Sequence, residues 1–122
     1  MRVFFADSYA IIDYLKGNKR YVKYFEDNEI ITTRLNLMEV YYSTLIEGTA
    51  EKADEYYDSF LGKCVDAGDE TIKSAMKFRA RERKKKLSYI DALGYRVALE
   101  NKIKFLTGDI QFRGMKDVEF VK

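Results

Sequence analysis

The sequence predicts an α/β fold of three layers, in which helices cover both faces of a central, mostly parallel sheet of five strands. Short apolar runs alternate along the chain with longer stretches of helical periodicity, an order typical of parallel strands joined by crossover helices. The chain has no Pro and only 7 Gly, so no segment resembles a linker. We therefore expect residues 1–122 to form a single domain.

The first third of the chain predicts two strands and two helices. Residues 3–6 (VFFA) are continuously apolar, as in a strand that is buried on both faces. Ser8 can cap a helix that ends near Gly17, and a second helical stretch covers about residues 19–27. Residues 30–33 (IITT) are β-branched throughout and predict the second strand.

The middle of the chain is expected to be mainly helical. Apolar residues at helical spacing predict one helix over residues 36–47 and another over residues 50–61. Cys64 and Val65 form a weak, short strand candidate. Asp69 is expected to cap a long helix that ends near Lys86.

The last third of the chain returns to strands. Ser88 opens a helix over residues 88–101 that is expected to bury Gly94. Residues 103–106 and 118–121 are the remaining strands, and a short helical turn is expected after Asp109.

Composition restricts the chemistry that the chain can carry out. There is no His, which excludes Ser-His-Asp and Cys-His nucleophile systems and His-ligated zinc. The single Cys64 excludes an internal disulfide, thiolate zinc and iron–sulfur sites, and fits a reducing cytosol. No apolar run approaches the roughly 18 residues that a membrane span requires, and we expect a cytoplasmic protein with no membrane partner. Oxygen atoms are the metal ligands that remain.

Four acidic residues stand where the expected strands end or where helices begin. Asp7 directly follows the first strand, and Asp109 follows the strand over residues 103–106 after a Thr-Gly turn. Glu39 and Asp91 each lie in the expected first turn of a helix. Ligands of an open parallel sheet bind beyond the carboxyl ends of the strands, at the switch in strand order. We therefore expect the four carboxylates to converge at that edge.

Four unpaired carboxylates in one crevice repel one another unless a cation compensates them. Mg²⁺ and Mn²⁺ prefer oxygen ligands, so the acids predict a site for one of these ions. The chemistry that follows is phosphodiester hydrolysis, in which one or two ions orient an attacking water, lower its pKa and neutralise charge on the phosphate. The predicted catalytic and metal-binding residues are Asp7, Glu39, Asp91 and Asp109.

Each acid also has a purely structural interpretation. Glu39 and Asp91 both stand three residues after an Asn or a Ser, which matches a capping box. Asp7 could be an ordinary helix cap, and Asp109 an ordinary residue of a Gly-Asp turn. A single acid in such a position is weak evidence for a site. The prediction depends on all four acids lying directly after a strand or at the start of a helix.

The acids lie in four segments with a characteristic order: residues 5–12 (FADSYAII), 35–40 (LNLMEV), 88–93 (SYIDAL) and 106–112 (LTGDIQF). In order, spacing and total length these segments resemble the PIN-domain ribonucleases, and in particular the VapC-type toxins of prokaryotic toxin–antitoxin pairs. The resemblance covers essentially the whole chain. The poorly marked strand at Cys64 is the one departure from the pattern.

The resemblance implies a five-stranded parallel sheet, Mg²⁺ or Mn²⁺ at the four acids, and cleavage of single-stranded RNA. It implies Asp7, Glu39 and Asp91 as the metal ligands, and Asp109 as the ligand of a second ion or as a residue that orients water. It also implies a homodimer and a small antitoxin protein that inserts into the active-site groove.

Residues beside the acids and a run of cations are candidates for supporting roles. Ser8, Asn36 and Thr107 could hold the acids by hydrogen bonds, or could serve as helix caps and turn residues. The cations that end the predicted long helix could contact RNA phosphates, or could form a solvated helix end that suits the helix dipole. The RNA-binding candidates are Arg79, Arg83, Lys84, Lys85 and Lys86.

Two other classes of function stay open on the sequence. A receiver-like phosphoacceptor domain requires an adjacent acidic pair after the first strand, which Asp7 lacks, although Asp66 stands near the phosphoacceptor position. A non-catalytic module that keeps the nuclease fold for docking a partner would not need all four acids. Six tyrosines exceed what a core needs and suit a dimer interface better than base stacking: Tyr9, Tyr14, Tyr41, Tyr42, Tyr56 and Tyr57.

Overall fold

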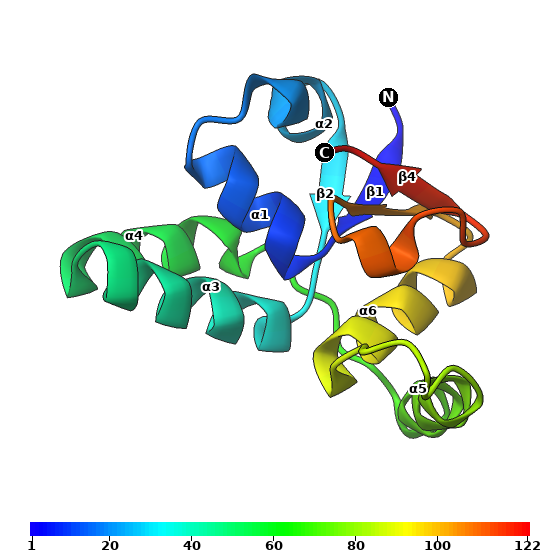
Figure 1. The fold of residues 1–122 in the computed structure, drawn as a ribbon. Helices are drawn as coiled ribbons and strands as arrows, with labels where there is room; N and C mark the ends of the chain where they lie inside the picture. Colours follow the sequence, from blue (N-terminus) through cyan, green and yellow to red (C-terminus); the bar gives the residue numbers. More distant parts are fainter.

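The structure, a computed structural model, describes residues 1–122 as four strands, six α-helices and two short 3₁₀ helices (Figure 1). The strands are β1 Val3–Ala6, β2 Glu29–Ile31, β3 Lys104–Thr107 and β4 Val118–Phe120. The α-helices are α1 Ser8–Leu15, α2 Val22–Glu26, α3 Arg34–Glu47, α4 Ala50–Leu61, α5 Asp69–Arg81 and α6 Tyr89–Glu100. The 3₁₀ helices are η1 Lys19–Tyr21 and η2 Ile110–Phe112. None of the helices has the length and apolar character needed to cross a membrane.

The sheet is entirely parallel, in the order β2-β1-β3-β4. Phe5 of β1 pairs with Ile31 of β2 on one side and with Phe105 of β3 on the other. The chain first adds β2 on one side of β1, and then adds β3 and β4 on the other side. The switch point in strand order therefore lies between the carboxyl ends of β1 and β3.

The fifth strand predicted at Cys64 and Val65 is absent as a strand. It is reduced to a single bridge between Thr32 and Cys64, supported by a hydrogen bond from Thr32 N to Lys63 O (3.0 Å) and one from Val65 N to Thr32 O (2.9 Å). The bridge is at Thr32, and the chain enters helix α3 after Thr33, so no further residues of this segment are left to pair on that side. The sheet consequently has four strands where five were predicted.

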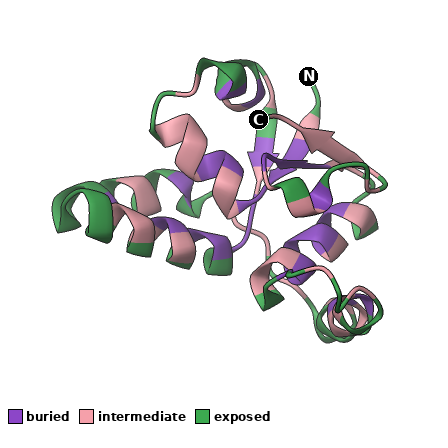
Figure 2. Ribbon diagram, viewed as in Figure 1, coloured by how far each residue is buried: buried purple, intermediate pink, exposed green.

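Helices cover both faces of the sheet, so the predicted three-layer α/β architecture is confirmed. Successive residues of a strand point to opposite faces, and here Phe4 belongs to the core under α1–α4 while Phe5 belongs to the core under α5 and α6. Figure 2 shows the buried residues on the inner sides of the helices. At Gly94 of α6, an added Cβ would lie 2.8 Å from the Phe5 ring, so the glycine lets α6 approach β1 closely.

Three helices differ from their predicted bounds. The stretch expected as one helix over residues 19–27 is divided into η1 and the short α2. Helix α3 begins two residues early because the extended Thr33, and not Asn36, is its N-cap. Helix α5 follows Gly68 as its N-cap, in place of Asp69, and ends at Arg81 instead of Lys86. Like charges at helical spacing are destabilising, and the cations after residue 82 accordingly lie in a loop.

Candidate active site at the carboxyl ends of the strands

Asp7 lies at the switch point, directly after β1, and is only 3% exposed. Its Oδ1 accepts the N–H of Ala10 at 2.8 Å, which makes Asp7, and not Ser8, the N-cap of α1. Its Oδ2 accepts the hydroxyl of Thr107 at 2.5 Å. Both carboxylate oxygens are thus held by neutral donors from two different parts of the chain.

Thr107 links the acid after β1 to the acid after β3. Its hydroxyl donates to Asp7 and accepts the N–H of Asp109 at 2.9 Å. Asp109 in turn caps η2, since its Oδ1 accepts the N–H of Gln111 at 2.9 Å. The short helical turn predicted after Asp109 is therefore confirmed, and its start brings Asp109 to the same edge of the sheet as Asp7.

Glu39 is reached through a chain of polar side chains between α1 and α3. The hydroxyl of Ser8 donates to Glu39 Oε1 at 2.5 Å, and Asn36 Nδ2 donates to Ser8 Oγ at 3.0 Å. The hydroxyl of Thr33 completes the chain by donating to Asn36 Oδ1 at 2.6 Å. Since Thr33 is the cap, Glu39 lies in the second turn of α3, and the capping-box interpretation of Glu39 is wrong.

Asp91 does form a capping box. Ser88 N donates to Asp91 Oδ2 at 2.9 Å, and Asp91 N donates to Ser88 Oγ at 3.0 Å. This arrangement fixes Asp91 at the start of α6, a helix that contacts β1, β3 and α3. The capping role does not exclude a second role, because Asp91 Oδ1 makes no hydrogen bond.

Electrostatics couples the four acids. Burial raises the pKa of Asp7 to about 7; the hydrogen bonds from Thr107 and Ala10 oppose that rise, and the charges of Asp91 and Asp109 add to it. Burial also raises the pKa of Glu39, to which the charge of Asp91 adds. Burial likewise raises the pKa of Asp91, to which the charge of Asp109 adds. None of the four forms an ion pair with Lys or Arg. The cation that interacts with the group is Lys122, whose pKa is raised mainly by its hydrogen bond to Tyr9 and to a smaller extent by the charge of Asp109.

No three of the four acids lie close enough together in this structure to hold a metal ion. Each is instead turned toward a protein donor, while Glu39, Asp91 and Asp109 each keep one oxygen without a hydrogen bond. The donor set is entirely carboxylate, which fits Mg²⁺ or Mn²⁺. Binding such an ion would require the carboxylates to move closer together than they are in this structure.

The cation run is divided between two hollows. A pocket of about 380 Å³ is lined by Arg79, Arg83, Lys85, Lys86, Leu87 and Ser88; we call it the basic pocket. Lys84 lies outside it, beside a neighbouring hollow. Arg79 Nε donates to Leu87 O at 3.0 Å, and Lys85 Nζ donates to Gln111 O at 3.3 Å. The loop therefore joins the end of α5 to both η2 and the start of α6.

The PIN domain family matches residues 4–118, a span that includes all four acids. The chain belongs to the PIN domain family. With the PIN fold established, the receiver-like alternative is wrong. Asp66, the residue that favoured it, lies exposed and pairs with Arg34 at 3.4 Å.

Solved structures of toxins and toxin complexes share the fold of this PIN domain. Mycobacterium tuberculosis VapC20, described as a sarcin-ricin loop cleaving toxin, matches with a TM-score of 0.76 at 16% identity, over 98% of this chain and 99% of its own. VapBC2 from Rickettsia felis, bound to a DNA fragment from its promoter, gives 0.74 at 17% identity, over 98% and 97%. A toxin–antitoxin complex from Klebsiella pneumoniae gives 0.73 at 16% identity, over 98% and 96%. No curated protein sequence matches the chain.

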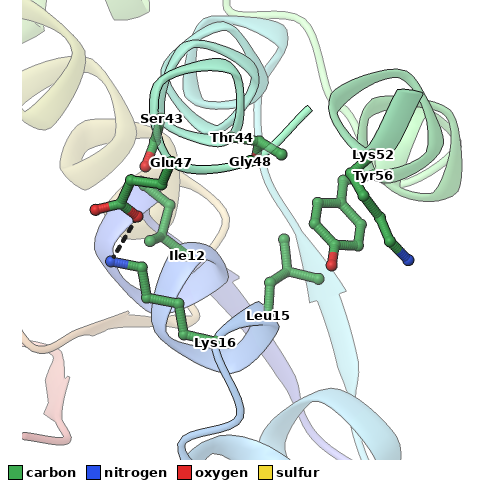
Figure 3. Close-up of a pocket in the computed structure, with 9 residues that line it drawn as sticks. All are labelled: Ile12, Leu15, Lys16, Ser43, Thr44, Glu47, Gly48, Lys52 and Tyr56. Atoms are coloured by element: carbon green, nitrogen blue, oxygen red, sulfur yellow. Dashed lines mark ion pairs between the residues drawn. The ribbon is translucent and has the colours of Figure 1, made fainter. Parts of the chain in front are cut away.

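A further hollow of the PIN domain lies apart from the acids, between α1, α3 and α4 (Figure 3). It has a volume of about 250 Å³, and its one carboxylate, Glu47, is paired with Lys16 at 3.0 Å. Because Glu47 is paired with Lys16, the hollow differs from the candidate active site, whose four acids form no ion pair.

Two residues near the acids of this PIN domain were missed by sequence reasoning. Thr33 supports Asn36, and the spacing Thr33-x-x-Asn36 is itself a capping pattern that could have revealed it. Tyr89, at the first position of α6, was not among the tyrosines singled out. No sequence signal marks it, because its contact with Arg79 depends on the turn between α5 and α6.

Proposed function

We propose that this PIN domain is a metal-dependent endoribonuclease that hydrolyses phosphodiester bonds of single-stranded RNA, and that it is the toxin of a toxin–antitoxin pair. The observation that supports this most strongly is the coupled set of four acids, none of which forms an ion pair with Lys or Arg. The fold shared with VapC20, a toxin that cleaves the sarcin-ricin loop, supports ribonuclease activity over other hydrolytic chemistry.

Asp7, Glu39 and Asp91 would hold Mg²⁺ or Mn²⁺, and Asp109 would hold a second ion or orient the attacking water. When bound, the ion would supply charge neutralisation for the phosphate and a lower pKa for the attacking water. Ser8 and Thr107 keep the carboxylates of Glu39 and Asp7 in position. Positive charge beside Asp7 would favour its ionised form and bring its pKa down from about 7.

Helix α3 exposes large apolar side chains that suit a protein interface. Contiguous apolar patches of this kind mark partner-binding surfaces, and we expect a homodimer and a small antitoxin protein as partners in the cytoplasm. The exposed residues are Leu35, Met38, Tyr42, Leu45 and Ile46.

Glu39→Gln is the sharpest test of the proposed activity. Gln keeps an oxygen that can accept the Ser8 hydroxyl, and Glu39 has no capping role, so the variant should fold normally. Wild type should cleave an unstructured RNA with Mn²⁺ or Mg²⁺ and be inactive in chelator, and Glu39→Gln should lose roughly 100-fold or more of the rate. A wild type that binds RNA with no cleavage under any metal would favour the non-catalytic binding module.

A further inference from the structure

Tyr89 offers a flat aromatic surface at the start of α6. Its side chain is 66% exposed, although it lies two residues from the candidate ligand Asp91. The guanidinium of Arg79 lies over the ring, 4.3 Å from its centroid, so one face of the ring is occupied by a cation. A tyrosine held in this way has its orientation restricted before any ligand binds.

Arg79 is itself fixed by the backbone. Its Nε donates to Leu87 O at 3.0 Å, which ties the last turn of α5 to the residue before the Ser88 cap. Leu87 is buried in the core under α5 and α6, so this anchor does not depend on a mobile surface group. Arg79 and Tyr89 therefore form a platform whose cation is anchored to the backbone.

The basic pocket adjoins this platform, since Arg79 belongs to both. Arg83 and Lys86 line the pocket and form no ion pair with any acid, so their charges are available to an anion. A phosphate in the pocket would lie beside Ser88, whose backbone N–H is bonded to Asp91. An aromatic face, a cationic pocket and a candidate catalytic carboxylate thus meet at the start of α6.

We propose that Tyr89 and the basic pocket form a nucleotide subsite for single-stranded RNA. An unpaired base stacks on Tyr89 and an adjoining phosphate binds Arg83 and Lys86, which leads the strand into the acid cluster. The proposal rests on the proposed function. It assigns Tyr89 a positioning role, because the side chain contacts the substrate away from the reacting phosphate.

Single-stranded RNA fits these features better than an acidic peptide does. Every base has a face that can stack on an aromatic ring, and a strand places a phosphate one nucleotide away from each base. Duplex RNA keeps its bases stacked on one another and cannot present one to the ring. A peptide carboxylate would satisfy the pocket but has no reason to require the exposed ring.

The test measures binding of a labelled RNA oligonucleotide by fluorescence anisotropy in chelator, where cleavage cannot interfere. Tyr89→Ala should weaken binding roughly tenfold, the size of one base–aromatic stack, and Tyr89→Phe should bind like wild type. Ile72→Ala is the control for the loss of an exposed apolar side chain, because Ile72 is 45% exposed on α5 and lies outside the basic pocket. It should leave RNA binding unchanged.

A series of oligonucleotides with one abasic position each makes the test specific for stacking. Wild type should lose affinity at one position of the series, and Tyr89→Ala should show no loss there, since the two changes remove the same contact. If Tyr89→Ala keeps its abasic penalty, or binds intact RNA like wild type, the subsite is refuted while the ribonuclease proposal stands. If wild type neither binds nor cleaves RNA, both proposals fail. If Tyr89→Ala impairs only binding of a co-purified protein partner, the platform serves that partner and the subsite is refuted.

Discussion

Asp7→Asn should stabilise the metal-free protein at neutral pH, although it removes a candidate ligand. Burial raises the pKa of Asp7 from 3.8 to about 7, so ionising this carboxyl in the folded state costs free energy that the unfolded chain does not lose. At 1.36 kcal/mol for each tenfold change in proton affinity, the cost approaches about 4 kcal/mol above pH 7. Asn can still accept the N–H of Ala10 and so keep the cap of α1. The rearranged contact with Thr107 should cost about 1–2 kcal/mol, which leaves a net gain of about 2–3 kcal/mol.

The pH dependence provides the decisive signature. Because the folded pKa is raised above the unfolded one, Asp7 does not reduce wild-type stability below about pH 4. Its destabilising effect grows as the pH rises and is complete above about 7. The advantage of Asp7→Asn should therefore be absent at pH 4.5 and largest at pH 8. The raised pKa values of Glu39 and Asp91 act in the same direction, but they are present in both proteins and largely cancel in the comparison.

Urea unfolding in chelator at several pH values measures this difference. Asp58→Asn is the matched control, since Asp58 is exposed on α4 and makes no hydrogen bond or ion pair through its side chain. An exposed substitution of this kind should change the free energy of unfolding by no more than about 0.5 kcal/mol. A constant difference between Asp7→Asn and wild type from pH 4.5 to pH 8 would refute the argument that burial opposes the charge of Asp7.

Three further predictions concern the metal, the cations and a turn. Mn²⁺ should raise the melting temperature of wild type. The increase should be smaller for Asp91→Asn, because stabilisation by a ligand depends on its affinity for the folded state. An equal increase in both proteins would leave Asp91 with its capping role alone. Replacing Arg83, Lys84, Lys85 and Lys86 with Gln should make RNA binding less dependent on salt. The slope of log affinity against log salt concentration should become shallower by about 0.7 for each phosphate contact that is lost. An unchanged slope would mean that these residues form a solvated loop with no phosphate contacts. Gly108→Ala should destabilise the fold by about 1–3 kcal/mol, because its Cβ would lie 2.6 Å from Val121 O and 2.3 Å from the Tyr9 ring; Gly62→Ala, with open space around it, is the control in the same thermal melts.

Local patterns predicted a large part of this molecule. A continuously apolar run such as residues 3–6 can be satisfied only by burial on both faces, which indicates a parallel sheet between helices. An acid after a strand or near the start of a helix is likewise visible in the chain, and the order of four such acids sufficed to indicate the PIN family. These features depend on neighbours within a few residues, which is why the sequence reveals them.

Helix starts were predicted less well, because several residues compete for the same backbone amides. Thr33 and Asn36 can both cap, and the chain uses Thr33, since Asn36 is needed by Ser8 on another helix. The choice moves Glu39 from a capping box into a polar contact with α1. The end of α5 was predicted too late for a different reason. Helical propensity alone does not show that a run of like charges is better solvated in a loop than in a helix.

By itself, the sequence determined which carboxylates are candidate metal ligands, that His and thiolate chemistry is excluded, and which layers enclose the sheet. Only the tertiary structure decided which donors hold those carboxylates. The bond from Thr107 to Asp7 joins residues 100 positions apart, and the stack of Arg79 on Tyr89 requires the turn between α5 and α6. The burial that raises the pKa of Asp7 is also a sum over packed neighbours from several elements. Contacts of this kind form when the helices close over the sheet, and no local pattern encodes them.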